Sequence, residues 1–419
     1  MQTTRQKISV FKHQMSEKLA GNWYQLVRAS ERRAAVKNIK EKTPFVVGVT
    51  GSCGKSTTVM LVNRILSKAY GQDVQMGYSS NSQRSVYRTF RKLVKNNQTV
   101  VQEISAAGGS GYLDYLVRDI PTNIAVLTAI GTDHAKAFPS SHDIVLEKEK
   151  ILASLVPGGT ACLNIDDEHI AQIAERANKD VKQITVSCER DADIRAHIRS
   201  ADWKRQLSFD VTVEGHTHFV QTKFVGTIAL HNVLLAIAVV HAMGLAIEPA
   251  IKVLAEMGSI ENRGNIQQTQ DGQSFLLDSY KAPLWSTQLF INDLENIRNG
   301  PMIMVLGHLS DTGNGGAQKY RQTLNRALPH VDLLIGIGRC YSSAQRIKKA
   351  DPTANVLACE TIDDVLAAIA PHPDALIILK SAKNAKIWRI FAAKDAPVSC
   401  KVQLCSLETE CKNCKLLRA

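Results

Sequence analysis

A glycine-rich turn at residues 48–58, GVTGSCGKSTT, constrains the fold of this chain more than any other stretch. The apolar run 44–49 before it is typical of a buried strand, and residues 59–66 after it have helical spacing. The general phosphate-loop pattern has glycine where this chain has Val49, so the match is to the shorter form G-x-x-G-K-S-T. A strand-to-helix turn of this kind predicts that the chain binds the phosphates of a nucleotide.

Each residue type in the turn suits that chemistry. Gly51 and Gly54 let backbone N–H groups approach phosphate oxygens at a helix N-terminus. Lys55 supplies a positive charge, and the hydroxyl of Ser56 can ligate Mg²⁺. A glycine turn with a purely structural role needs none of these partners. The predicted nucleotide-binding stretch comprises Gly51, Ser52, Cys53, Gly54, Lys55, Ser56 and Thr57.

Strand-like and helical patterns alternate from residue 44 to about 258, which favours an α/β fold with a mostly parallel sheet. The predicted strands of this block are 45–49, 99–104, 124–128 and 159–164. Residues 207–225 read as a hairpin with its turn at Glu214 and Gly215, and a helix is expected over 231–243. The 419 residues are 44% hydrophobic, enough for two or three packed domains.

A second alternating block follows residue 263, and it resembles a separate Rossmann-like α/β domain. Its predicted strands are 275–277, 302–306, 333–337 and 376–379. The expected division is therefore a basic helical segment over 1–43, a central phosphate-loop domain over 44–260, and a C-terminal domain with a cysteine-containing tail over 261–419.

The formal charge of +12 would suit nucleic acid, but only 5% of residues are aromatic and no nucleic-acid module is recognisable. Small polyanionic substrates account for it equally well. The basic excess over residues 1–42 indicates either a helical face packed on the main body or a docking site for an acidic protein partner. The apolar residues at helical spacing in it are Leu19, Trp23, Leu26 and Val27.

Targeting and thiol patterns point to the cytoplasm. No apolar run approaches the roughly 20 residues of a membrane helix, and the N-terminus lacks a secretory signal. Nine cysteines in a chain of this size favour reduced thiols. Cys400, Cys405, Cys411 and Cys414 form an irregular array at the C-terminus, read as loose thiols, with a zinc or redox role as the alternative.

Three charged segments follow the phosphate loop. Glu103 ends an apolar run, where a carboxylate beside a phosphate site suits Mg²⁺. Asp133 and His134 come just beyond another buried strand. Lys148 and Lys150 are expected at the start of a helix. Taken singly, each of these is more often an exposed or structural residue.

Together with the loop, these segments resemble the Mur ligase family over residues 44 to about 390, most closely its D-alanyl-D-alanine-adding branch. The segments that carry the resemblance are GVTGSCGKSTT, EISAAGG, NIAVLTAIGTDHAKAF, EKEKIL, ALHN at 229–232, ENRG at 261–264, LLDSYKAPLWS, VLGHLSDTG and LKSAKNAK. The resemblance implies an ATP- and Mg²⁺-dependent ligase that phosphorylates a carboxylate to an acyl phosphate. An amine then attacks the acyl phosphate to form an amide, and ADP and phosphate leave.

The resemblance also implies roles for individual residues. Lys55 would contact the transferring phosphate, while Ser56 and Glu103 would hold one Mg²⁺. His134 and a carbamylated Lys148 would hold or position a second. The remaining implied nucleotide contacts are Asn81, Asn232, Arg263 and Asp278, and the implied substrate contacts are Lys281 and Lys380. Closure of the C-terminal domain would exclude water from the intermediate.

Departures from the family pattern concern the substrate. About 43 residues precede Pro44, fewer than the uridine-nucleotide domain of wall-building members needs. We therefore expect a specialised ligase joining a carboxylate to an amino acid, a peptide or a carrier-bound amine. A folylpolyglutamate-type or amino-acid-polymer ligase is the alternative enzyme. A non-catalytic ATP-binding partner protein is the alternative outside catalysis.

Overall fold

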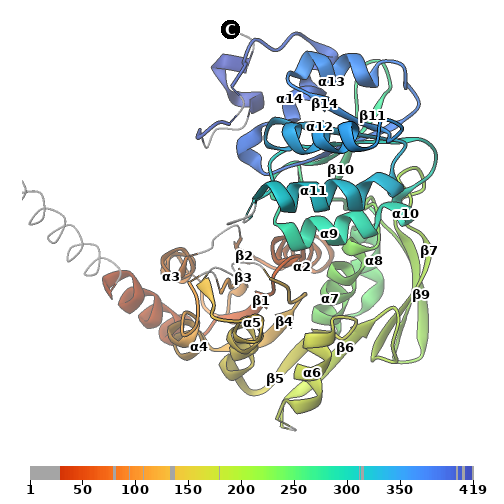
Figure 1. Ribbon diagram of the computed structural model, residues 1–419. Helices are drawn as coiled ribbons and strands as arrows, with labels where there is room; N and C mark the ends of the chain where they lie inside the picture. Colours follow the sequence, from red (N-terminus) through yellow and green to blue (C-terminus); the bar gives the residue numbers. More distant parts are fainter. Residues whose placement is uncertain are drawn as a thin grey trace, which may run out of the picture.

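The computed structural model describes residues 29–78, 82–93, 95–106, 108–132, 137–178, 180–310, 312, 316–402, 404–407 and 411–417. Its strands form two separate sheets, each covered by helices on both faces (Figure 1). The α/β class predicted from the sequence is confirmed, with one large, mostly parallel sheet and a second, smaller one.

The first sheet has the order β2-β3-β1-β4-β5-β6-β7-β8-β9 and is parallel up to β7. Its strands are β1 (Phe45–Thr50), β2 (Val74–Gly77), β3 (Thr99–Glu103), β4 (Thr122–Leu127), β5 (Leu155–Asn164), β6 (Lys182–Ser187), β7 (Ile194–Ser200), β8 (Ser208–Val213) and β9 (His216–Gln221). The β8–β9 hairpin turns at Glu214 and Gly215, both at positive φ, as its sequence predicts.

Two hydrophobic clusters hold this sheet between layers of helices. On one face α2 (Lys55–Tyr70), α7 (Ile228–Ala242) and α8 (Ile247–Leu254) pack together. On the other face lie α3 (Gln83–Arg91), α4 (Asp114–Asp119), α5 (Ser141–Glu149) and α6 (Glu168–Arg176). Ten of the eleven residues 230–240 of α7 are buried, which explains why that helix is apolar on nearly all sides.

The second sheet has the order β10-β11-β15-β12-β13-β14, with only β10 antiparallel to its neighbour. Its strands are β10 (Asn265–Gln268), β11 (Ser274–Asp278), β12 (Met302–Leu306), β13 (Leu333–Ile337), β14 (Val356–Cys359) and β15 (Leu376–Lys380). The helices α9 (Leu284–Asn292), α10 (Leu294–Ile297), α11 (Gly316–Ala327) and α12 (Tyr341–Ala350) cover one face, and α13 (Ile362–Ile369) and α14 (Trp388–Asp395) cover the other. The domain boundaries proposed from the sequence stay a prediction.

The strands β2, β6, β7, β10 and β14 went unpredicted. β2, β10 and β14 have four residues each, and β7 alternates buried and exposed positions with arginines on the exposed side. Such short or charged segments carry too little hydrophobic pattern to stand out, and pairing with a neighbouring strand decides their structure.

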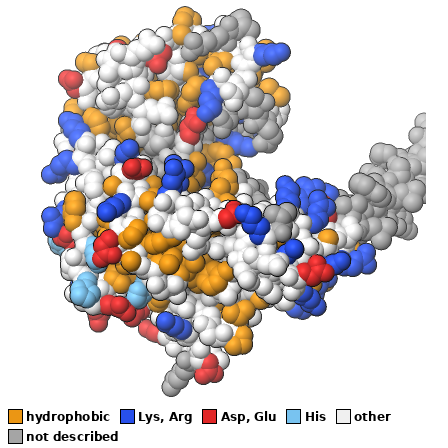
Figure 2. All heavy atoms as spheres, turned by 180° about the vertical axis from the view of Figure 1, so that it is seen from behind, with side chains coloured by type: hydrophobic (Ala, Val, Ile, Leu, Met, Phe, Trp, Pro, Cys, Tyr) orange, Lys and Arg blue, Asp and Glu red, His pale blue; other side chains and the backbone are white. Residues whose placement is uncertain are grey.

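The described part of the basic N-terminal segment is a helix over residues 29–42 that packs on the first sheet's domain. Ala35 and Ile39 are buried there, and the carboxylate of Glu31 forms ion pairs with Arg84 and Arg88. Figure 2 shows Lys and Arg side chains gathered where this helix meets the body of the protein. The four apolar residues expected to pack this segment, Leu19, Trp23, Leu26 and Val27, lie outside the described residues.

No helix among the described residues is long and apolar enough to cross a membrane.

Candidate functional site

The glycine-rich turn joins β1 to α2, the strand-to-helix context that its sequence predicts. Gly54 occupies the position before the helix with φ +83°, and a Cβ built there would lie 2.1 Å from Oδ1 of Asn232. At Gly51, with φ +149°, a Cβ would lie 2.0 Å from Oγ1 of Thr128. Both glycines are therefore required by backbone conformation and by close packing, in addition to any ligand.

Residues after β4 hold the turn in place. Oγ1 of Thr128 donates to the carbonyl of Cys53 at 2.5 Å, and the amide of Gly131 donates to Oγ of Ser52 at 2.8 Å. Thr128 was not among the predicted site residues, although it lies in one of the segments that carry the family resemblance. A threonine after a strand has no distinguishing pattern, so only the tertiary structure shows this contact.

Ser56 and Glu103 come together as expected for a metal site. Oγ of Ser56 donates to Oε2 of Glu103 at 2.7 Å, because Ser56 lies in the first turn of α2 and Glu103 ends β3, the strand beside β1. The two residues are 7% and 2% exposed. A hydroxyl and a carboxylate are hard oxygen donors, so this pair fits Mg²⁺.

Lys55 and Lys148 meet at a single backbone oxygen. Their Nζ atoms donate to the carbonyl of Gly51 at 2.6 and 3.1 Å. Lys148 is 1% exposed and lies in the last turn of α5, so the expected position at a helix start was wrong. The helix begins earlier, at Ser141, because the side chain of Ser140 accepts a hydrogen bond from the amide of Asp143.

Most of the predicted residues line one cavity of about 220 Å³. Its lining residues come from the phosphate loop and α7 on one side and from β11, α9 and the end of β15 in the second sheet's part on the other. The predicted residues on its wall are Ser52, Cys53, Gly54, Lys55, Ser56, Thr57, Glu103, Asn232, Arg263, Asp278, Lys281 and Lys380. Gly51 and Lys148 are not on the cavity wall, and the hydrogen bond described above joins them.

The second sheet contributes a pair of charges at the ends of neighbouring strands. Asp278 ends β11 and Lys380 ends β15, and these two residues are aligned in the parallel ladder. Nζ of Lys380 is 2.6 Å from Oδ2 of Asp278, and also donates to the carbonyl of Lys281 at 3.1 Å. The side chain of Lys380 is 4% exposed, so its charge is neutralised locally.

Two further cations face the same space. The guanidinium of Arg263 stacks over the ring of Tyr280, 4.2 Å from its centre. Burial, together with the positive charge of Lys55, lowers the pKa of Lys281. Tyr280 was not predicted, although it lies in the segment LLDSYKAPLWS between two residues that were. The cavity wall thus carries Lys55, Arg263 and Lys281 beside the paired Lys380 and Asp278, and such cations suit phosphate and carboxylate ligands.

Asn81, Asp133 and His134 lie outside the described residues, so their predicted positions stay predictions. The four tail cysteines, by contrast, are all described. Cys400, Cys405, Cys411 and Cys414 line a cavity of about 50 Å³ near Lys386 and Arg389, and each is a free thiol. The two interpretations of this array, loose thiols and a zinc or redox site, both stay open.

A Mur ligase middle domain matches residues 49–240. The UDP-N-acetylmuramoyl-tripeptide–D-alanyl-D-alanine ligase of Bacillus subtilis is 27% identical over 285 residues, covering 66% of this chain and 58% of that protein. The chain thus spans less than two thirds of the length of this curated relative.

Solved structures of MurF proteins have folds similar to that of this chain. MurF from Acinetobacter baumannii superposes with a TM-score of 0.76 at 22% identity, covering 88% of this chain and 80% of that one. MurF ligase from Thermotoga maritima, solved in complex with ADP, gives 0.75 at 17% identity, covering 88% and 84%. At these identities the likeness establishes the fold.

Proposed function

The chain belongs to the Mur ligase family through the middle domain at residues 49–240, and from this premise we propose that it uses ATP to join a carboxylate to an amine. The reaction would run in two steps. The γ-phosphate of ATP is transferred to a carboxylate oxygen, giving an acyl phosphate and ADP. The amine then attacks the acyl carbon, and phosphate leaves with the oxygen it received.

The observation that carries this proposal is the distribution of charge around the 220 Å³ cavity. Lys55 stands on the phosphate-loop wall, and Arg263 and Lys281 stand on the wall from the second sheet, beside Lys380, which is paired with Asp278. Transfer of a phosphoryl group between two anions needs positive charge on both sides of the transferring group. A cavity that only anchored a nucleotide would need cations on the loop side alone.

Ser56 and Glu103 would hold Mg²⁺, which neutralises charge on the ATP oxygens when bound. Lys55 contacts the transferring phosphate, and the backbone amides that follow Gly51 and Gly54 bind the neighbouring phosphates of ATP. Asn232, Arg263 and Asp278 position the nucleotide between the domains. Lys281 and Lys380 orient the reacting carboxylate or its acyl phosphate. Asn81 and His134 belong to this set as predictions from the sequence.

Carbamylation of Lys148 is part of the proposal. An unmodified Lys148 donates from its Nζ to the carbonyl oxygen of Gly51 at 3.1 Å. The Nζ of Lys55 donates to the same oxygen at 2.6 Å, so two ammonium groups share one acceptor. Two like charges this close in a buried site repel each other. A carbamate on Lys148 removes that repulsion and provides an anionic oxygen for a second Mg²⁺.

We further propose a specialised substrate pair in the cytoplasm rather than the wall precursors of the relatives. Support comes from the segments DSYKAPL and VLGHLSDTG, whose sequences depart from the family pattern. Their residues 278–284 and 305–310 lie at and after the ends of β11 and β12. The incoming group is an amino acid, a small peptide or a carrier-bound amine.

Mass spectrometry of the full chain with ATP, Mg²⁺ and a metabolite extract tests the function. ADP, phosphate and a conjugate equal to two metabolites minus one water are expected. AMP and pyrophosphate would refute the acyl-phosphate route. A ladder of products differing by one residue would identify a polymer-forming ligase, and binding of ATP without turnover of any extract would favour a non-catalytic partner protein.

A further inference from the structure

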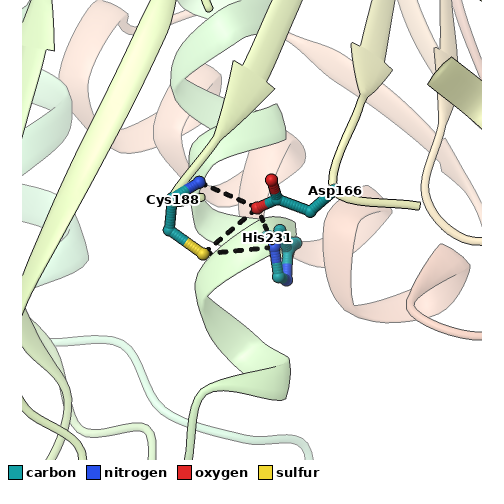
Figure 3. A group of neighbouring side chains, drawn as sticks. All are labelled: Asp166, Cys188 and His231. Carbon is teal, nitrogen blue, oxygen red and sulfur yellow. Dashed lines mark hydrogen bonds and ion pairs between the residues drawn. The ribbon is translucent and has the colours of Figure 1, made fainter. Parts of the chain in front are cut away.

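Three side chains with metal-ligating chemistry meet at the carboxyl edge of the first sheet (Figure 3). Asp166 follows β5, Cys188 follows β6, and His231 lies in the first turn of α7. In the part of the chain that the structure describes, this is the one group of three or more such residues whose ligand atoms all lie within 4.8 Å of one another. Neither the phosphate loop nor the cavity above uses any of them.

One of the three distances within this trio matches those around a tetrahedral zinc ion, and the other two are shorter. Nε2 of His231 lies 3.6 Å from Sγ of Cys188 and 2.8 Å from Oδ2 of Asp166, and the sulfur lies 3.1 Å from the same oxygen. With zinc bonds of about 2.3 Å to sulfur and about 2.1 Å to nitrogen and oxygen, tetrahedral ligands are about 3.4–3.6 Å apart. The S–N distance already matches, and the other two need to open by about half an ångström.

Supporting contacts hold the carboxylate in position. The amide of Cys188 donates to Oδ2 of Asp166 at 2.8 Å, and the hydroxyl of Ser187 bonds the other oxygen. Burial raises the pKa of Asp166, but the hydrogen bonds from His231, Cys188 and Ser187 outweigh it and hold this pKa well below its usual range. The side chain of Asp166 is 6% exposed and that of His231 is 26% exposed, which leaves one side of the trio open to a fourth ligand.

The same residue types could form a nucleophilic triad, but the geometry opposes that interpretation. A triad needs the carboxylate on one ring nitrogen and the thiol on the other. Here the sulfur and the carboxylate both approach Nε2 of His231. Burial and the charge of Asp166 also raise the pKa of Cys188 to about 12, so the sulfur carries its proton unless a metal ion displaces it.

We propose that Asp166, Cys188 and His231 bind one Zn²⁺ ion, with water as the fourth ligand. One sulfur, one nitrogen and one oxygen donor suit a borderline ion such as zinc, whereas Mg²⁺ prefers oxygen alone. The ion would tie together the ends of two strands and the start of α7. His231 precedes Asn232, whose Oδ1 accepts from Oγ1 of Thr58 at 3.2 Å, so the ion would also fix one wall of the nucleotide cavity.

Cobalt substitution of the full chain tests this site. Protein freed of metal by chelator under reducing conditions is titrated with Co²⁺, and a sulfur-to-cobalt charge-transfer band is expected to saturate at one ion per chain. The Cys188→Ser variant is expected to lose the band, because its only sulfur ligand is gone. Circular dichroism confirms that the variant is folded before the titration is interpreted.

The tail cysteines provide the matched control. A variant with Cys400, Cys405, Cys411 and Cys414 all changed to serine is expected to keep the cobalt band. Zn²⁺ at one hundred times its Kd is expected to raise the Tm of wild type and of this control by several degrees, and to leave Cys188→Ser unchanged. A band that survives Cys188→Ser in the variant that also lacks the four tail cysteines, or a band that never forms in wild type, overturns the site. These readouts do not depend on ligase turnover, so the metal site and the proposed function can fail separately.

Discussion

The hydroxyl of Ser56 lies 2.7 Å from Oε2 of Glu103, which places one donor from the start of α2 against one from the end of β3. Because β1 and β3 are adjacent and parallel, their carboxyl ends meet at the same edge of the sheet. Two oxygen donors of the kind that Mg²⁺ prefers thereby lie together without a contribution from any loop.

Changing Glu103 to Gln should weaken use of Mg²⁺. The amide removes the negative charge while keeping the shape, so the Mg²⁺ concentration for half-maximal ATP turnover should rise by about tenfold or more, since even the loss of an outer partner costs 10–100-fold in metal affinity. The measurement is ATP turnover against Mg²⁺ concentration. The exposed Glu256→Gln serves as the control, and identical Mg²⁺ curves for both variants would remove Glu103 from the metal site.

Gly54→Ala should abolish nucleotide binding. The added Cβ would lie 2.1 Å from Oδ1 of Asn232, at a residue with φ +83°. Gly71→Ala is a matched control, because Gly71 also has positive φ, +62°, but nothing lies within 4 Å of its Cβ. Both variants carry the strain of a positive φ, but only Gly54→Ala places its new methyl group against the side chain of Asn232. Titration with a fluorescent ATP analogue distinguishes them, and equal loss in both would assign the effect to strain.

Lys55→Ala should reduce ATP turnover by about 10²-fold or more, since it removes a cation from the transferring phosphate. Lys92→Ala is the control, because that lysine is exposed and outside the cavity. ADP release under saturating ATP measures the effect. Retention of wild-type turnover by Lys55→Ala would exclude the proposed role.

Lys148→Ala should lower turnover while sparing much of the nucleotide binding, because Lys148 is not on the cavity wall and contacts only the carbonyl of Gly51 among the loop groups whose bonds to it are described. Removal of dissolved CO₂ should lower wild-type turnover in the same way, and added bicarbonate should restore it, if the lysine carries a carbamate. The alanine variant should not respond to bicarbonate. Full activity of Lys148→Ala would show that the carbamate assignment is wrong.

Lowering the pH should weaken the packing of the helix of residues 29–42 on the domain of the first sheet. Hydrogen bonds from Arg84 lower the pKa of Glu31 against the opposing effect of burial, with Arg88 adding to the shift. A folded-state pKa below the ordinary value of 4.5 means that this stabilisation is present above pH 4.5 and is lost as pH falls through the folded-state pKa. Hydrogen exchange of the helix measured from pH 6 downward tests this. Glu31→Gln should reduce the pH dependence and leave the part due to the ion pair of Arg32 with Asp119, and an unchanged profile would contradict the prediction.

The sequence by itself determined the phosphate loop and most of the strands. Glycines at 51 and 54, a lysine and a serine at fixed spacing have few uses other than phosphate binding, and the apolar runs at β1, β3, β12 and β15 are buried on both faces. Their pattern is local, so it can be read without knowing what packs against it. The hairpin turn at Glu214 and Gly215 is local in the same sense.

Which of these segments contact one another was decided only by the tertiary structure. Asp166 and Cys188 are 65 and 43 residues from His231 in sequence, and no spacing rule connects them. The pairing of Lys380 with Asp278 spans 102 residues and depends on β11 and β15 being neighbours in the ladder. Strand order places such side chains at a common edge, and that order follows from the packing of both sheets as a whole, which no single segment encodes.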